Sequence, residues 1–216
     1  MTARRPAALQ DRSANTQDRL CDAAEGLLRG GGLAACTIQA VAERAKRAPA
    51  SVYRRFGDKD RMIEAVLERY LARTLEANKA NFEMLRRRFP DLEGRLKAVV
   101  DGTIAGRRRD GRLAEAFREA AARSSRDSFP KAARRMREVT LSLASEALHE
   151  CAADPARARR IDLALGVLAG AIETLMRAPQ PFSDRFLRNE LYTMLLSYLT
   201  AADHRAAMQT MPTRRR

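Results

Sequence analysis

Residues 37–56 read TIQAVAERAKRAPASVYRRF, and this stretch predicts two short helices with a tight turn between them. Thr37 is suited to cap the first helix, because its hydroxyl can accept a hydrogen bond from a first-turn amide. Pro49 suits the first position of the second helix, since its missing N–H is no loss there and its φ is already helical. One face of each helix is apolar at helical spacing, through Ile38, Val41, Ala42 and Ala45 in the first and Val52 and Phe56 in the second.

The second helix keeps a small, basic and partly aromatic outer face, made of Pro49, Ala50, Ser51, Tyr53, Arg54 and Arg55. The major groove of DNA accepts a short helix with such a face. Arg54 is the best candidate for bidentate recognition of the O6 and N7 atoms of guanine. Pro49 and Ala50 can touch a thymine methyl group or simply allow close approach. These residues predict the base-reading part of a DNA interface.

The phosphate backbone is expected to be contacted by hydroxyl and basic side chains around this helix. Thr37, Ser51, Tyr53 and Lys59 are predicted to donate hydrogen bonds to phosphates, and Lys46 and Arg47 are predicted to add attraction to the DNA backbone. Arg55 leaves two interpretations open, a structural salt bridge or a DNA contact.

The stretch and its flanks resemble the helix-turn-helix domain of the TetR family of bacterial transcription regulators, over residues 15 to about 70. A bare helix-turn-helix pattern is weak evidence, whereas the run Ser-Val-Tyr-Arg-Arg-Phe-Gly-Asp-Lys after a Thr-capped helix is specific. The residues that match in register are Thr37, Ile38, Val41, Ala42, Ala45, Ser51, Val52, Tyr53, Phe56, Asp58 and Lys59, preceded by Ala23, Ala24, Leu27 and Leu28.

The turn departs from the family pattern at three positions. Lys46 and Arg47 stand where the family usually has glycine and an aliphatic residue, and Ala48 stands where it usually has Ser or Thr. Glycine serves where the backbone must turn left-handed, so Lys46 is expected to carry modest strain. The capping hydroxyl at position 48 is absent.

The resemblance implies a ligand-controlled switch. Carboxyl-terminal helices would enclose a small-molecule pocket, and ligand binding would move the helix that follows the motif and change the separation of two recognition helices. The expected lining comes from 96–104, Phe117 and 136–148. These residues are mostly aliphatic and favour an apolar effector, although each of them also fits a plain core position.

Helical periodicity and scarce β-branched runs predict an all-α chain of about nine helices, with an amino-terminal three-helix head linked by a fourth helix to a carboxyl-terminal bundle. Helices are expected near 16–29, where Gly30–Gly32 ends the helix, and from Asp58 to about 82. Further helices are expected over 92–106, 113–122, 156–177 and 183–202, and another begins at Pro130. A turn is expected at 107–111. The expected domains are a disordered basic arm over 1–14, a DNA-binding domain over 15–75 with its motif at 37–56, a ligand-binding and dimerisation domain over 76–202, and a disordered basic tail over 203–216.

The last two helices each carry two apolar faces. In 156–177 one face holds Ile161, Leu165, Leu168, Ile172 and Leu175, and another holds Leu163, Val167, Gly170 and Thr174; 183–202 carries Phe186, Leu187, Leu191, Met194, Leu195, Tyr198 and Leu199. A helix with two apolar faces buries both, so one face predicts a partner. We expect a homodimer through a four-helix interface, since a two-fold protein matches a palindromic operator. The alternative is that both faces lie in a monomer core.

The net charge of +14 favours a polyanionic partner. However, residues 1–60 hold eleven Lys and Arg against seven Asp and Glu, so most of the excess lies elsewhere and charge does not locate the DNA face. Arginine-rich composition from base-composition bias is the competing explanation. Arg4, Arg5 and Arg12 of the arm could enter a minor groove or be a solvated tail.

Other chemistry finds little support. His149 and His204 have no metal-ligand spacing, and no nucleophile–base pair, P-loop or GxSxG motif is present, so we expect no enzyme, metal or cofactor. Cys21, Cys36 and Cys151 fit a reduced cytoplasm, and no apolar run is long enough for a membrane span. The sequence thus predicts a cytoplasmic, ligand-responsive regulator that binds double-stranded DNA, with repression expected; the alternative is a basic helical protein that binds nucleic acid without sequence preference.

Overall fold

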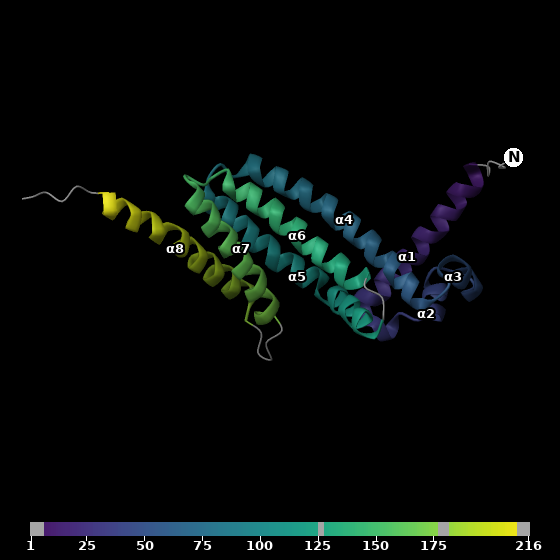
Figure 1. Cartoon of the computed structure of the whole chain (residues 1–216). Helices are drawn as coiled ribbons and strands as arrows, with labels where there is room; N and C mark the ends of the chain where they lie inside the picture. The colour runs from purple at the N-terminus through teal and green to yellow at the C-terminus, as the bar shows by residue number, and fades with distance from the viewer. Residues whose placement is uncertain (1–6, 125–127, 177–181, 211–216) are drawn as a thin grey trace, which may run out of the picture. The chain divides into compact units, whose positions relative to one another are not determined.

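The computed structural model describes residues 7–124, 128–176 and 182–210, although it does not place every side chain within them. Within these ranges the chain is α-helical and has no strand, which confirms the all-α prediction (Figure 1). Eight helices are present there, close to the nine expected: α1 (Ala7–Ala35), α2 (Ile38–Arg44), α3 (Pro49–Phe56), α4 (Lys59–Arg88), α5 (Leu92–Arg123), α6 (Ser128–His149), α7 (Pro155–Leu175) and α8 (Asp184–Thr210).

The helices form two compact units. The first unit holds the chain up to Thr74 together with Arg109–Met136, and the second holds Leu75–Arg108 together with the chain from Arg137 onward. The first unit is therefore larger than the DNA-binding domain that the sequence predicts, because the end of α5 and the start of α6 belong to it. A domain boundary based on sequence position alone misses this return of the chain.

The first unit is held by a core between α1, α2, α3 and the start of α4. Leu20, Leu28, Val41 and Val52 are fully buried there. Near the other end of this core Phe117 of α5 lies with its ring centroid 5.9 Å from that of Tyr70 of α4. The inner face of α3 packs in this core through Val52 and Phe56.

The second unit has its own core, formed by α5, α6, α7 and α8 with the end of α4. The inner stripes of α7 and α8 are buried as the periodicity predicts, through Ile161, Leu165, Leu168 and Ile172 on α7 and Leu187, Leu191, Leu195 and Leu199 on α8. Asp154 caps α7 by accepting a hydrogen bond of 2.7 Å from the amide of Arg157. Asp154 is thus the N-cap of α7, and Pro155 lies in its first turn.

The ends of the chain contain more helix than the sequence predicts. α1 begins at Ala7, within the expected arm, and α8 continues to Thr210, within the expected tail. Both extensions are rich in alanine, the residue with the highest helix propensity. Of the predicted minor-groove residues, Arg4 and Arg5 lie outside the described residues, and Arg12 falls within α1.

Glycines end helices less often in this chain than the sequence predicts. In α1 only Gly32 leaves helical geometry, at φ 70° and ψ −164°, so the break falls at the last of the three expected glycines. In α5 the predicted turn at 107–111 is wrong, since one helix runs from Leu92 to Arg123. A glycine costs a helix only about 1 kcal/mol, and burial of Ile104 and Leu113 on either side outweighs that cost.

A charge cluster of Glu25, Arg29, Arg73, Arg109 and Asp110 ties α1 to α4 and α5 within the first unit. Glu25 accepts hydrogen bonds from Arg29 at 2.8 Å and from Arg73 at 2.7 Å. Asp110 accepts from Arg29 at 2.6 Å and from Arg109 at 2.9 Å. Arg29 therefore joins two buried carboxylates on different helices.

Burial opposes ionisation of Asp110, but hydrogen bonds from Arg109 and Arg29 outweigh it and hold the pKa of this carboxyl below its ordinary value. The charged form is thus favoured in the folded protein. Its stabilising contribution is complete above the unfolded-state pKa of about 3.9 and is lost as the pH falls through the lower folded-state pKa.

We predict that Asp110→Asn lowers the free energy of unfolding by about 2–4 kcal/mol at pH 7, because it leaves Arg29 partly buried without its second carboxylate. Urea denaturation measures the change. Glu115→Gln removes an equally charged group from the surface of the same helix and should cost under about 1 kcal/mol. Equal costs for the two variants, or a cost for Asp110→Asn that does not shrink below about pH 4, would contradict this role.

Candidate nucleic-acid interface

The predicted helix-turn-helix is present, with α2 and α3 in the expected places (Figure 1). The hydroxyl of Thr37 accepts a hydrogen bond of 3.1 Å from the amide of Ala40, so Thr37 is the N-cap of α2. Pro49 occupies the first turn of α3, and Gly57 at φ 82° ends it by donating to the carbonyl of Tyr53 at 2.7 Å. Each cap follows from the local sequence.

The turn between the helices is left-handed at Lys46, whose φ is 54°. Its amide donates to Glu43 at 3.0 Å, and the next amide, of Arg47, donates to Ala42 at 2.9 Å. Lys46 is the one non-glycine residue with positive φ in the described part of the chain. The geometry at position 46 is the one that glycine favours, and lysine adopts it here at the cost of local strain.

α3 is fixed by one face and open on the other. Val52 and Phe56 are buried in the core, whereas Tyr53 is 55% exposed. The predicted DNA-facing residues on this helix and its turn, Lys46, Arg47, Pro49, Ala50 and Arg54, are all exposed, and Ser51 is half-buried. The chain therefore presents these side chains together on the outside of α3 and of the turn that precedes it.

The cations of this surface keep their charge available. In the described part of the chain, Lys46, Arg47 and Arg54 pair with no carboxylate, although ion pairs occupy many other arginines. Arg55 differs, because it is half-buried and already interacts within the protein. No internal ion pair has to break when these cations contact phosphate or guanine, so the pattern fits a polyanionic partner.

Lys59 has an internal role that the sequence did not indicate. Its ammonium group donates a hydrogen bond of 3.1 Å to the carbonyl of Leu33, just after the kink in α1. Asp58, where this helix is expected to begin, caps α4 by accepting a hydrogen bond of 2.8 Å from the amide of Arg61. A phosphate contact by Lys59 would have to use the two remaining protons of its ammonium group.

The buried cysteines behave as small apolar side chains. Desolvation by burial raises the pKa of Cys36 to about 11, against the opposing influence of Lys59. Burial likewise raises the pKa of Cys21. Both thiols stay protonated near neutral pH and are therefore poor nucleophiles.

The residues expected to line a ligand pocket fall into two different cores. Leu96, Val100 and Ile104 are buried in the second unit, as is Leu148. Phe117 is buried in the first unit. Sequence spacing placed all of them on inward faces but could not tell which core each one joins.

One Ser–His–Asp grouping lies between α6 and α7 but lacks the geometry of a catalytic triad. His149 Nε2 lies 3.1 Å from Ser145 Oγ and 2.9 Å from Asp162 Oδ1. Both partners meet the same ring nitrogen, whereas a triad needs the nucleophile and the acid on opposite nitrogens. No group of His, Cys, Asp and Glu in the described ranges is placed to hold a metal ion, and none of the helices searched there is long and apolar enough to cross a membrane.

The family model described as bacterial regulatory proteins, tetR family, matches residues 20–66, which include α2, the turn and α3. The amino-terminal domain is a tetR-family domain. No curated protein matches the chain.

Solved structures at low sequence identity share this fold over most of the present chain. A transcriptional regulator from Rhodococcus sp. Rha1 shares 22% identity at a TM-score of 0.65, over 86% of this chain and 96% of that one. A putative TetR-family transcriptional regulator from Mesorhizobium loti shares 17% sequence identity at a TM-score of 0.68, over 88% of this chain and 98% of that one. The transcriptional regulator FadR from Bacillus subtilis, in complex with stearoyl-CoA, shares 16% sequence identity at a TM-score of 0.61, over 84% of this chain and 98% of that one. At these identities the likeness shows the fold.

We predict that Lys46→Gly stabilises the protein by about 1 kcal/mol, because glycine adopts positive φ without the Cβ penalty. Arg47→Gly removes the same charge from the adjacent residue, which lacks positive φ, and should destabilise by about 0.5–1 kcal/mol. Chemical denaturation of both variants measures the difference. If Lys46→Gly is no more stable than Arg47→Gly, the turn is not strained as described.

Proposed function

We propose that this protein is a cytoplasmic transcription regulator that binds a palindromic DNA operator as a homodimer and is released by a small-molecule effector. The main support is the outer face of α3, where Arg54 is exposed and unpaired within the described chain while Val52 and Phe56 anchor the helix. A rigid helix with an unpaired arginine suits base recognition in the major groove. We propose that the protein is a repressor, because binding of the effector would then release it from the operator and restore transcription.

The residues at the DNA take distinct roles in this proposal. Arg54 donates two hydrogen bonds to a guanine, while Pro49 and Ala50 allow close approach to the base edges. Contacts with phosphate come from Thr37, Ser51, Tyr53 and Lys59, with Lys46 and Arg47 adding attraction to the backbone. The phosphate contacts fix the register of the helix, and the arginine supplies the sequence preference.

The proposed dimer uses the outer faces of α7 and α8. Leu163 and Val167 on α7 and Phe186, Met194 and Tyr198 on α8 are large apolar side chains that remain exposed. A Cβ atom added at Gly166 or Gly170 would meet no other atom within 4 Å, so this face of α7 is open to close approach by another helix. Two copies could bury these faces as a four-helix interface and would present two α3 helices to half-sites one turn of DNA apart, about 34 Å.

The proposed effector binds among the helices of the second unit, on segments of α5 and α6 that are mostly aliphatic. FadR, which shares the fold, binds stearoyl-CoA, a ligand with a long apolar chain. An apolar effector suits the present lining in the same way. The effector must bind the DNA-incompetent form more tightly than the DNA-bound form, because equal affinity would shift nothing.

Binding of nucleic acid without sequence preference is the other candidate, supported by the net charge of +14. Competition with scrambled duplex separates the two functions. A regulator should prefer its operator over scrambled DNA by about 10³ or more, whereas a non-specific binder should show no preference.

We predict that Arg54→Ala costs about 1–3 kcal/mol in operator binding and relaxes the preference at one base pair in each half-site. Fluorescence anisotropy on operator, singly substituted operator and scrambled duplexes measures both effects. Arg159→Ala removes an exposed arginine of α7 that has no carboxylate partner in the described part of the chain, and it should leave both the affinity and the base preference unchanged. An unaltered ratio of operator to scrambled binding in Arg54→Ala would remove this residue from base recognition.

We predict that Leu163→Lys converts the dimer to monomer, because it places a charge in the apolar α7 and α8 face. Met84→Lys is the matched control, since Met84 on α4 and Leu163 are both 58% exposed. Sedimentation velocity should show a dimer for the wild type and Met84→Lys and a monomer for Leu163→Lys. A dimer that survives Leu163→Lys with unchanged affinity would place the interface elsewhere.

A further inference from the structure

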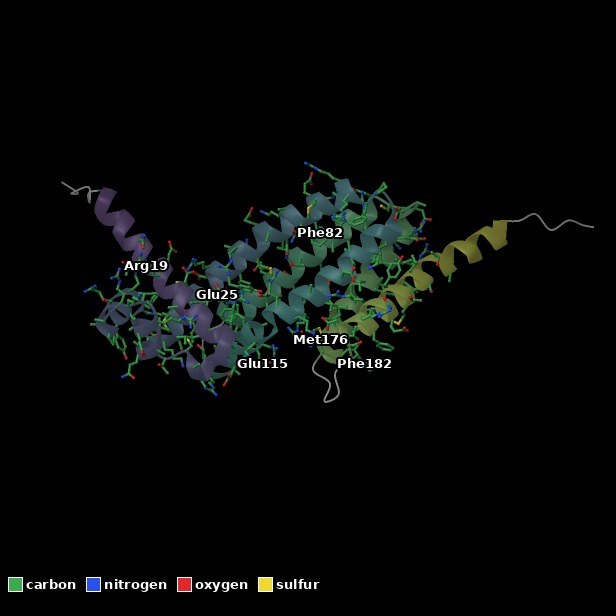
Figure 2. The ribbon with its side chains drawn as sticks, turned by 180° about the vertical axis from the view of Figure 1, so that it is seen from behind. Arg19, Glu25, Phe82, Glu115, Met176 and Phe182 are labelled. Atoms are coloured by element: carbon green, nitrogen blue, oxygen red, sulfur yellow. The ribbon has the colours of Figure 1, made fainter. Side chains whose placement is uncertain are left out.

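An open groove of about 400 Å³ lies on the first unit, between α1 and the carboxyl end of α2. We name it the α1–turn groove. Its lining comes from Arg19, Asp22 and Ala23 of α1 and from Arg44, Ala45 and Lys46 at the end of α2 and in the turn. Of these residues only Lys46 belongs to the interface described above. Figure 2 shows Arg19 on α1.

The charge of the groove is strongly positive. Arg19, Arg44 and Lys46 are exposed, and none of them pairs with a carboxylate among the residues that the structure describes. The single acid in the lining, Asp22, is already engaged by Arg69 of α4 at 2.8 Å. Three cations therefore face the opening with no anion committed to them.

The shape of the groove depends on small residues. Ala23 and Ala45 form a buried apolar floor. One turn along α1 from Asp22, a Cβ atom added to Gly26 would lie 2.9 Å from Nη2 of Arg44. Glycine at this position lets the guanidinium of Arg44 lie against α1, so the groove keeps a cation along its wall.

We propose that the α1–turn groove binds a phosphodiester of the DNA backbone and supplies sequence-independent affinity. The groove is open, which suits a continuous polymer better than a small anion that needs enclosure. It also shares Lys46 with the turn that leads directly into α3. Cations that pair with no carboxylate within the described chain can neutralise phosphates and release the counterions condensed on DNA without first breaking an internal ion pair. The proposal rests on DNA binding by α3, as proposed above, and adds Arg19 and Arg44 to the contact.

The test uses the full-length double variant Arg19→Gln/Arg44→Gln. Both changes lie outside the predicted DNA face and keep side chains of similar length. The control is Arg137→Gln/Arg159→Gln, which removes two exposed arginines of the second unit that pair with no carboxylate among the described residues. Binding to an operator duplex selected by the wild type, and to a scrambled duplex of equal length, is measured from 50 to 300 mM KCl.

Each lost phosphate contact reduces the magnitude of the slope of log K against log salt by about 0.9. The dimeric double variant loses four contacts, two in each protomer, so we expect the magnitude to fall by about 3.6 on both duplexes. The ratio of operator to scrambled binding should stay within about twofold of wild type, because no base is read. The control pair should keep the wild-type slope, and thermal melting should show all variants folded.

Three results would overturn the proposal: an unchanged slope in the groove variant, an equal loss in the control pair, or a loss confined to the operator duplex. Tight binding of inorganic phosphate by the wild type, abolished in the double variant while DNA slopes persist, would assign the groove to a small anion instead. If the wild type fails to prefer any operator, the proposed regulator function fails, yet the slopes on scrambled DNA still decide the groove.

Discussion

Burial of Val52 and Phe56 is the constraint on which the rest of this structure depends. These two side chains, four residues apart, place one face of α3 in the core of the first unit and leave the other face in solvent. A helix of eight residues has little stability in isolation, so its rigidity comes from this packing. Because α3 cannot rotate without exposing Phe56, Arg54 and Tyr53 are presented in a fixed direction. Any function that requires a preorganised surface on α3 rests on that anchor.

The charged side chains of the first unit fall into two groups. Buried or half-buried arginines such as Arg29 and Arg69 are paired with acids and join α1 to α4 and α5. Exposed cations around the motif, including Arg44 and Arg54, are left unpaired within the described chain. The first set stabilises the fold, and the second remains available to an anion. This division lets the first unit hold a compact core and still present a basic surface around the motif.

Local sequence predicted the caps and stripes well, because their causes are local. Thr37, Pro49 and Asp154 begin helices where short-range hydrogen bonding and φ preference require it. Continuity was predicted poorly: α5 passes through Gly106 and Gly111 since tertiary burial outweighs glycine propensity. Partnerships between distant residues were also missed. Lys59 reaches the carbonyl of Leu33, and Arg44 lies against Gly26, and neither pairing has a signal in spacing alone.

In the proposed function, α3 reads DNA bases, and a symmetric dimer presents two copies of it. Sequencing of the genomic DNA fragments retained by the purified full-length protein tests it most directly. The account predicts one enriched inverted repeat, with half-site centres separated by one helical turn of DNA or a multiple of it. Fragments that show no enriched sequence over the input, or a motif without two-fold symmetry, would contradict it.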